Sequence, residues 1–135
     1  MERERTTKIT ESEWQIMEQV WAYHESMEPG NQAEEDGITQ PTLMALLGKK
    51  WNKNTVHTFL KRLCEKGFLE VVKDTSPHRY VPLVSREACE KEERRSFLDR
   101  VYQGSAGRMV AAFVRDGDLS EEDVKELRKL LEGFQ

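Results

Sequence analysis

Residues 51–67, WNKNTVHTFLKRLCEKG, hold the side chains of this chain that are best suited to contacting a polyanion. Read as a helix, the segment has an apolar face at the i, i+3, i+4, i+7 spacing that buries: Val56, Phe59, Leu60 and Leu63. Its other faces are polar and free of acids before Glu65. Asn pairs with adenine, Arg pairs with guanine, and a Thr methyl meets the thymine methyl, so this face suits base recognition. Thr55, Thr58 and Arg62 are expected to lie along the base-reading line, with Asn54 and Lys61 beside it, and His57 is a further residue expected to contact DNA.

Lysines cluster where this helix would begin, and a His–Arg pair lies in the turn of a predicted β-hairpin further along. Lysine side chains and the free N–H groups of a first helical turn both suit phosphate oxygens. The hairpin turn can add contacts to the DNA backbone or the minor groove. Lys49, Lys50 and Lys53 are the expected phosphate contacts, His78 and Arg79 are expected to add contacts to the DNA backbone, and Asn52, the expected N-cap, completes the residues expected to contact DNA.

The charge of the chain is unevenly distributed. The 135 residues carry a formal net charge of −4, and the pI is about 5.5. Residues 39–83 hold eight basic and three acidic side chains, a net of +5, so the remainder carries −9. A basic middle inside an acidic chain predicts a local polyanion-binding surface and argues against a general nucleic-acid coat protein.

Catalytic and metal-binding patterns are missing from the sequence. His24, His57 and His78 fall in three different predicted elements, without metal-ligand spacing. Cys64 and Cys89 follow no motif, and we expect two reduced thiols. The chain shows neither a glycine-rich phosphate loop nor a nucleophile elbow. We therefore expect a protein that is not an enzyme and that uses no cofactor and no metal.

The hydropathy pattern predicts a soluble cytoplasmic protein without membrane insertion. No apolar run approaches the ~20 residues of a membrane helix. The N-terminal MERERTTKIT has charge but no apolar stretch of the secretory type.

The elements expected before residue 85 form a winged helix-turn-helix domain, residues 1–84. A helix is expected over 11–24, with Thr10 and Glu13 as a capping box, followed by an acidic surface loop over 25–37. A second helix follows Thr39 as N-cap, buries Leu43, Leu46 and Leu47, and stops at Gly48. The helix of about 52–66 comes next, then a hairpin over about 68–84, in which Pro82 suggests an edge strand.

Residues 85–135 predict three helices, over about 86–103, about 106–115, and from Ser120 as N-cap to the end. Their apolar stripes cannot bury themselves in about 50 residues, which favours a dimerisation module. The overall fold class is thus mainly α with a small β-hairpin. The expected dimerisation residues are Phe97, Leu98, Val101, Tyr102, Met109, Val110, Phe113, Val114, Val124, Leu127, Leu130 and Leu131.

Three motifs, in order, resemble the penicillinase and methicillin-resistance repressors (the BlaI/MecI/CopY group). They are ITESEWQIMEQVW, WNKNTVHTFLKRLCEKGFLE, and SFLDRVYQGSAGRMVAAFV with DLSEEDVKELRKLLE, and the resemblance covers nearly the whole chain, from Ile9 to Leu131. The resemblance implies a homodimeric winged-helix repressor on a palindromic operator. It also implies induction by proteolysis in the C-terminal module, triggered by a membrane sensor-protease that detects β-lactams.

Two departures from the family qualify what the resemblance implies. The scissile bond of the family is Asn–Phe, whereas the matching position here is Ala112–Phe113, so that only the phenylalanine agrees. The loop over 25–37 is also longer than the resemblance leads one to expect. The chain lacks the cysteine-rich tail of the copper-responsive branch, so metal sensing of that kind is not implied.

Two other readings stay open. One is a winged-helix module that binds another protein, which would need apolar residues exposed on the helix of about 52–66. The other is a direct sensor that holds a small molecule between the wing and the dimerisation module, which would need a convergent polar pocket.

Overall fold

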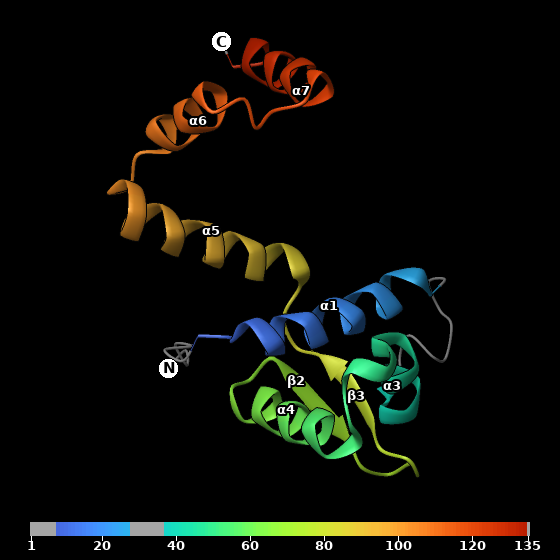
Figure 1. Ribbon diagram of the computed structural model, residues 1–135. Helices are drawn as coiled ribbons and strands as arrows, with labels where there is room; N and C mark the ends of the chain where they lie inside the picture. The colour runs from blue at the N-terminus through green and yellow to red at the C-terminus, as the bar shows by residue number, and fades with distance from the viewer. Residues whose placement is uncertain (1–7, 28–36, 135) are drawn as a thin grey trace. The chain divides into compact units, whose positions relative to one another are not determined.

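The computed structural model describes residues 8–27 and 37–134 (Figure 1). The chain divides into two compact units, Met1–Cys89 and Glu90–Gln135. The fold class is the expected one, a winged-helix domain and a helical domain. The described residues contain no helix that is long and apolar enough to cross a membrane.

Three α-helices pack together in the first unit: α1 (Glu11–Ser26), α3 (Gln40–Leu47) and α4 (Lys53–Glu65), with the 3₁₀ turn η1 (Gly48–Lys50) between the last two. Each starts at the expected cap. Thr10 and Glu13 form a capping box, Thr39 accepts from the Thr42 N–H, and Asn52 accepts from the Thr55 N–H at 2.8 Å. Helix α1 runs two residues beyond the expected end, so positions 25 and 26 are helical and not loop. The rest of the expected loop falls mostly outside the described residues.

A small antiparallel sheet completes this unit, in the order β1-β3-β2. Strands β2 (Leu69–Val72) and β3 (Arg79–Pro82) are the expected hairpin. Strand β1 (Ile38–Thr39) was not expected, because two residues are too few to show a period. Strand β1 can come close to β3 only because residue 37 is a glycine. Gly37 has φ +87°, and a Cβ added to it would collide with the Tyr80 carbonyl.

The expectation that Pro82 marks an edge strand is wrong, since β3 is the central strand. The pairing with β1 covers only Tyr80 and Arg79, and Pro82 lies beyond it, opposite Leu69 of β2. The missing N–H of Pro82 would face the β1 side of β3. Because β1 does not extend to Pro82, no hydrogen bond between these two strands is lost.

The core of the first unit lies between these helices and the sheet (Figure 1). Trp14 and Trp21 of α1 meet edge to face, with ring centroids 5.3 Å apart. The expectation that Leu46 is buried is wrong, since Leu46 is 47% exposed, whereas Leu43 is buried as expected. Three residues turn a helix by about 300°, which puts Leu46 on the opposite side of Leu43 from Leu47. The fully or nearly buried residues are Ile16, Met17, Val20, Trp21, Ile38, Leu43, Val56, Leu60, Leu63, Phe68, Leu69, Tyr80 and Cys89.

The second unit consists of the greater part of α5 (Arg86–Tyr102) and of α6 (Ala106–Arg115) and α7 (Glu121–Glu132). Helix α5 ends one residue before the expected position, where Gln103 has φ 49°. Ser105 caps α6, and Ser120 forms a capping box with Asp123 at the start of α7. The helices form as the sequence predicts, but their apolar stripes remain open.

Candidate nucleic-acid interface

Helix α4 separates its two faces as the sequence predicts. Val56, Leu60 and Leu63 are fully buried, and Phe59 is half-buried. Of the residues expected to contact DNA on this helix, Thr55 alone is half-buried. The exposed ones are Lys53, Asn54, His57, Thr58, Lys61 and Arg62.

Thr58 has its hydroxyl committed within α4. The Oγ1–H donates to the Asn54 carbonyl at 3.0 Å, a bond back along the helix. Its hydrogen is therefore used, and the methyl group is what Thr58 offers to an apolar partner such as the thymine methyl.

Two aromatic rings hold cations, one ring just before α4 and the other within it. Trp51 and Phe59 pack edge to face with centroids 5.6 Å apart. The Lys50 ammonium lies 5.6 Å from the Trp51 ring centroid, and the Arg62 guanidinium lies 5.9 Å from that of Phe59. Such cation–π contacts contribute about 0.5–1 kcal/mol at exposed sites. We call these four residues the aromatic–cation cluster. This cluster was not expected from the sequence, because Trp51 has extended backbone before the cap of α4 and lies outside the period of the helix.

Gln40 connects the first turn of α3 with the first turn of α4. Its side-chain Nε2–H donates to the Lys53 carbonyl at 3.0 Å. This bond fixes the two helix starts against each other, next to the residues Lys49 and Lys50 of η1, which are both exposed. A lone glutamine gives no sequence signal for a contact thirteen positions away.

Lys66, one of the eight basic residues of the central segment, is turned away from the polar face. Its Nζ donates to Glu13 Oε1 at 2.7 Å and to the Lys8 carbonyl at 3.0 Å. Glu13 is fully buried, and its Oε2 accepts no hydrogen bond within the described residues. Burial pushes the pKa of Glu13 up, but the bonds from Lys66 and from the Thr10 N–H outweigh it and hold the pKa below its usual value. The pair joins the end of α4 to the start of α1.

The two hairpin residues expected to contact DNA lie differently. His78 is exposed just before β3. Arg79 is half-buried within β3, and its Nη1–H donates to the Gly37 carbonyl at 3.0 Å. Arg79 therefore ties β1 to the sheet, and only its remaining N–H groups are available for a DNA contact, which stays a prediction.

Cys64 and Cys89 are both reduced thiols that form no disulfide. Cys89 is buried in the core, and burial raises the pKa of the half-buried Cys64. Within residues 8–27 and 37–134, no three His, Cys, Asp or Glu side chains converge as a metal site requires.

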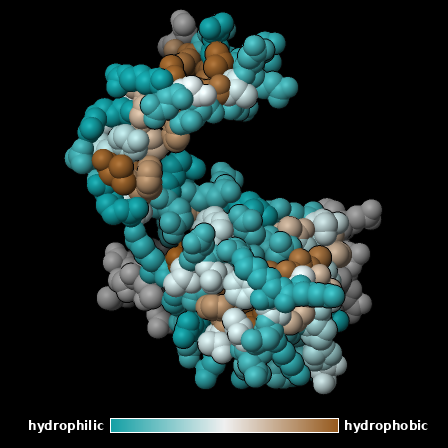
Figure 2. Space-filling view, in the orientation of Figure 1, coloured by the Kyte–Doolittle hydropathy of each residue, from teal (hydrophilic) through white to brown (hydrophobic). Residues whose placement is uncertain are grey.

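The residues expected to dimerise are mostly uncovered in the second unit. Figure 2 shows apolar side chains at the surface of α6 and α7 among hydrophilic ones. Leu98 is different, because it is only 7% exposed within the single chain. Tyr102, Met109 and Leu127 are half-buried. The exposed members are Phe97, Val101, Val110, Phe113, Val114, Val124, Leu130 and Leu131, each between 38% and 66% exposed.

Ala112 and Phe113, the residues at the position of the family's scissile bond, lie inside α6. Ala112 is half-buried and Phe113 is 43% exposed. A protease that binds an extended substrate strand would need this helix to unwind locally.

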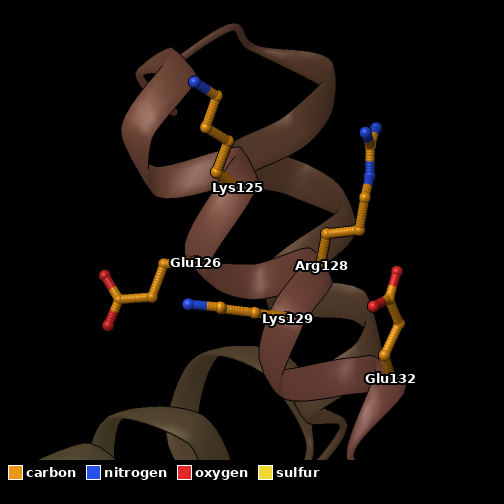
Figure 3. A pocket seen from close by; sticks show the side chains of 5 residues that line it. All are labelled: Lys125, Glu126, Arg128, Lys129 and Glu132. Carbon is orange, nitrogen blue, oxygen red and sulfur yellow. The ribbon is translucent and has the colours of Figure 1, made fainter.

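A shallow hollow of about 440 Å³ lies along α7, and its side chains point in different directions (Figure 3). It is an open charged surface without the convergent polar groups of a small-molecule site. The lining residues are Lys125, Glu126, Arg128, Lys129 and Glu132.

A winged helix whose α4 is cationic and free of acids before Glu65, together with a helical unit with open apolar stripes, defines a winged-helix transcription regulator. The chain belongs to the penicillinase repressor family, whose model matches residues 9–133. This confirms the resemblance seen in the three motifs.

Several curated relatives match over nearly their whole length. The methicillin resistance regulatory protein MecI of Staphylococcus aureus (strain N315) is 29% identical over 127 residues, covering 94% of this chain and 95% of the relative. The penicillinase repressor of Bacillus licheniformis is 29% identical over 125 residues, covering 93% and 90%. The penicillinase repressor of Staphylococcus aureus is 19% identical over 127 residues, covering 94% and 93%.

Proposed function

We propose that this chain is a cytoplasmic transcriptional repressor that binds a palindromic operator as a homodimer and has no catalytic activity. Each monomer places α4 in the major groove of one half-site. The observation that carries the proposal is the exposed face of α4, which is polar, cationic and free of acids over residues 53–62 in a chain of net charge −4.

The side chains divide into two sets by their expected partners. Asn54, Thr55, Thr58 and Arg62 face base edges, and His57 and Lys61 flank them. Lys49, Lys50, Lys53 and the open N–H groups at the start of α4 contact phosphates. The wing adds His78, and Arg79 through the N–H groups that Gly37 leaves unused.

The second unit supplies the dimer in this proposal. Exposed leucine, valine and phenylalanine side chains on α5, α6 and α7 need an apolar partner, and a second copy of the chain provides one. Two half-sites then lie about 34–36 Å apart or a multiple of this distance, so that both α4 helices enter the groove on one side of the duplex.

Derepression by proteolysis between Ala112 and Phe113 is part of the proposal. A membrane sensor-protease of a β-lactam response would sever α7 and the end of α6 from α5. The loss of the second unit's apolar surface would dissolve the dimer and leave single half-sites, which bind weakly.

The experiment is a selection of bound sequences from a random duplex pool at about 150 mM salt, which suppresses non-specific phosphate binding. We expect an enriched inverted repeat. A matched comparison repeats the selection with Val110→Asp and Val114→Asp together, which should give monomers and lose the repeat. A folded, dimeric protein that enriches no sequence would contradict the proposal and would favour a winged helix that binds another protein.

A further inference from the structure

One arginine fastens the first turn of α5 to α1. Arg86 Nε donates to Glu25 Oε2 at 2.9 Å, and its Nη2 donates to Glu25 Oε1 at 3.3 Å and to the Glu18 carbonyl at 3.4 Å. The guanidinium also lies 5.4 Å from the ring centroid of Trp21. We call Arg86, Glu25 and Trp21 the α5 latch. A paired fork on a carboxylate fixes orientation as well as distance.

The chain is anchored on both sides of Arg86. Before it, the Val84 carbonyl accepts from the indole Nε1–H of Trp21 at 3.0 Å. After it, Cys89 is 3% exposed within the core of the first unit. The first turn of α5 is therefore part of the first unit.

No loop separates this turn from the rest of α5. The helix is continuous from Arg86 to Tyr102, and the boundary between the two units falls inside it, after Cys89. Seventeen residues span about 25 Å at about 1.5 Å per residue. A change of about 10° at the start would displace the far end by about 4 Å, close to the ~3.4 Å rise of one base pair.

We propose that Arg86 determines which half-site spacing the dimer accepts, because it holds the start of α5 against α1. This inference rests on the proposed function, in which the second units join two DNA-binding units. Arg86 is then a positioning residue that touches no DNA. Its partners Glu25 and Trp21 act with it.

The latch adds little to the stability of the first unit. The side chains of Arg86 and Glu25 are 29% and 57% exposed, and such pairs contribute little to folding. A groove of about 350 Å³, lined in part by Pro82 and Leu83, adjoins them. When Arg86 is replaced by a shorter side chain, water can fill the space in this groove. We therefore expect the core around Trp21 to keep its packing.

The test measures binding to a series of duplexes. The inverted repeat selected by the unchanged full-length chain is rebuilt with one or two base pairs added to or removed from its centre. Each added pair turns one half-site by about 35° relative to the other. The unchanged chain should lose about tenfold or more in affinity per added or removed pair. Arg86→Ala should lose threefold or less per pair, while its dimerisation constant and Tm stay near those of the unchanged chain.

Three further variants sharpen the test. Glu25→Gln removes the charge of the partner and should also relax the spacing preference. Arg86→Lys keeps the charge without the fork and should lie between Arg86→Ala and the unchanged chain. Arg95→Ala, at an exposed arginine on the same helix, should keep the full preference.

The two ways to fail are distinguishable. If the unchanged chain selects no inverted repeat, the proposed function fails and the inference fails with it. If it selects one and Arg86→Ala keeps the tenfold preference, the inference alone is overturned. Should Arg86→Ala not fold, Glu25→Gln and Arg86→Lys decide in the same way.

Discussion

The buried pair of Glu13 and Lys66 makes the first unit sensitive to one substitution in a specific way. Lys66→Met keeps most of the side-chain volume and removes the only cation bonded to Glu13 among the described residues. Glu13 is fully buried, and its Oε2 already accepts no hydrogen bond there. The substitution therefore leaves a buried carboxylate with a single Thr10 N–H bond at its Oε1.

The expected loss is about 3–5 kcal/mol in the free energy of unfolding at pH 7, the usual effect of breaking a buried pair from one side. For a domain of this size, about 3 kcal/mol corresponds to a fall in Tm of roughly 12–24 °C. Replacing both partners, as Glu13→Gln with Lys66→Met, removes the stranded charge and should recover much of the loss. Lys61→Met is the matched control, because Lys61 is exposed on the same helix, and it should change stability by less than about 0.5 kcal/mol.

The difference in stability between Lys66→Met and the unchanged chain should depend on pH. In the unchanged chain the pKa of Glu13 in the folded state lies below its usual value. The ionised Glu13 therefore contributes to the free energy of unfolding at pH values above its unfolded pKa, and this contribution is lost as pH falls through the folded pKa. In Lys66→Met burial is left as the largest influence and raises the folded pKa. Its destabilisation is therefore greatest near pH 7 and is relieved as pH falls toward that raised pKa. The stability gap between the two proteins should narrow from pH 7 to pH 4.

Urea unfolding at several pH values, followed by circular dichroism, measures this gap. A Lys66→Met protein within about 0.5 kcal/mol of the unchanged chain would show that the pair does not hold the unit together. A large gap that stays constant with pH would show that the loss comes from packing and not from the charge of Glu13.

Other substitutions test the interface. Arg62→Ala should flatten the base preference at one operator position and cost about 1–3 kcal/mol in a binding titration, and unchanged preference there would place base reading elsewhere. Lys49→Ala with Lys50→Ala should weaken all sequences alike and reduce the salt slope of log Kobs by about 2; a sequence-dependent loss would contradict a phosphate role. Gln40→Ala should weaken specific binding severalfold with little change in Tm, measured by fluorescence anisotropy, because it frees the start of α4; full affinity would show that the Lys53 bond does not position the helix. Gly37→Ala should lower Tm by several degrees in a thermal melt, since its Cβ meets the Tyr80 carbonyl, and an unchanged Tm would refute that collision.

Sequence reasoning succeeded where the determining contacts are local. The caps Thr10, Thr39, Asn52 and Ser120 each bond a backbone N–H three residues ahead, so their spacing is visible in the sequence. The period of the α4 stripe, from Val56 to Leu63, likewise needs one helix only.

It failed where contacts join distant positions. The sequence places Glu13 only in a capping box with Thr10, whereas in the structure it also forms a buried ion pair with Lys66, 53 positions away. The central place of β3 depends on the two residues of β1, which pair with Tyr80 and Arg79 from 42 and 40 positions upstream. The bond from Arg86 to Glu25 spans 61 positions. Periodicity and capping carry no information about such pairs.

Because of the aromatic–cation cluster, Lys50 and Arg62 lose part of their conformational entropy when the protein folds and not when it binds DNA. A free lysine or arginine gives up about 1.5–2 kcal/mol of rotamer freedom when it becomes fixed. Lys50 over Trp51 and Arg62 over Phe59 are already restricted in the unbound protein. Part of that loss therefore occurs during folding, where the hydrophobic core offsets it, and less remains to oppose DNA binding. Lys53 and Lys61, which contact no ring in the structure's described part, would still lose theirs at the moment of binding.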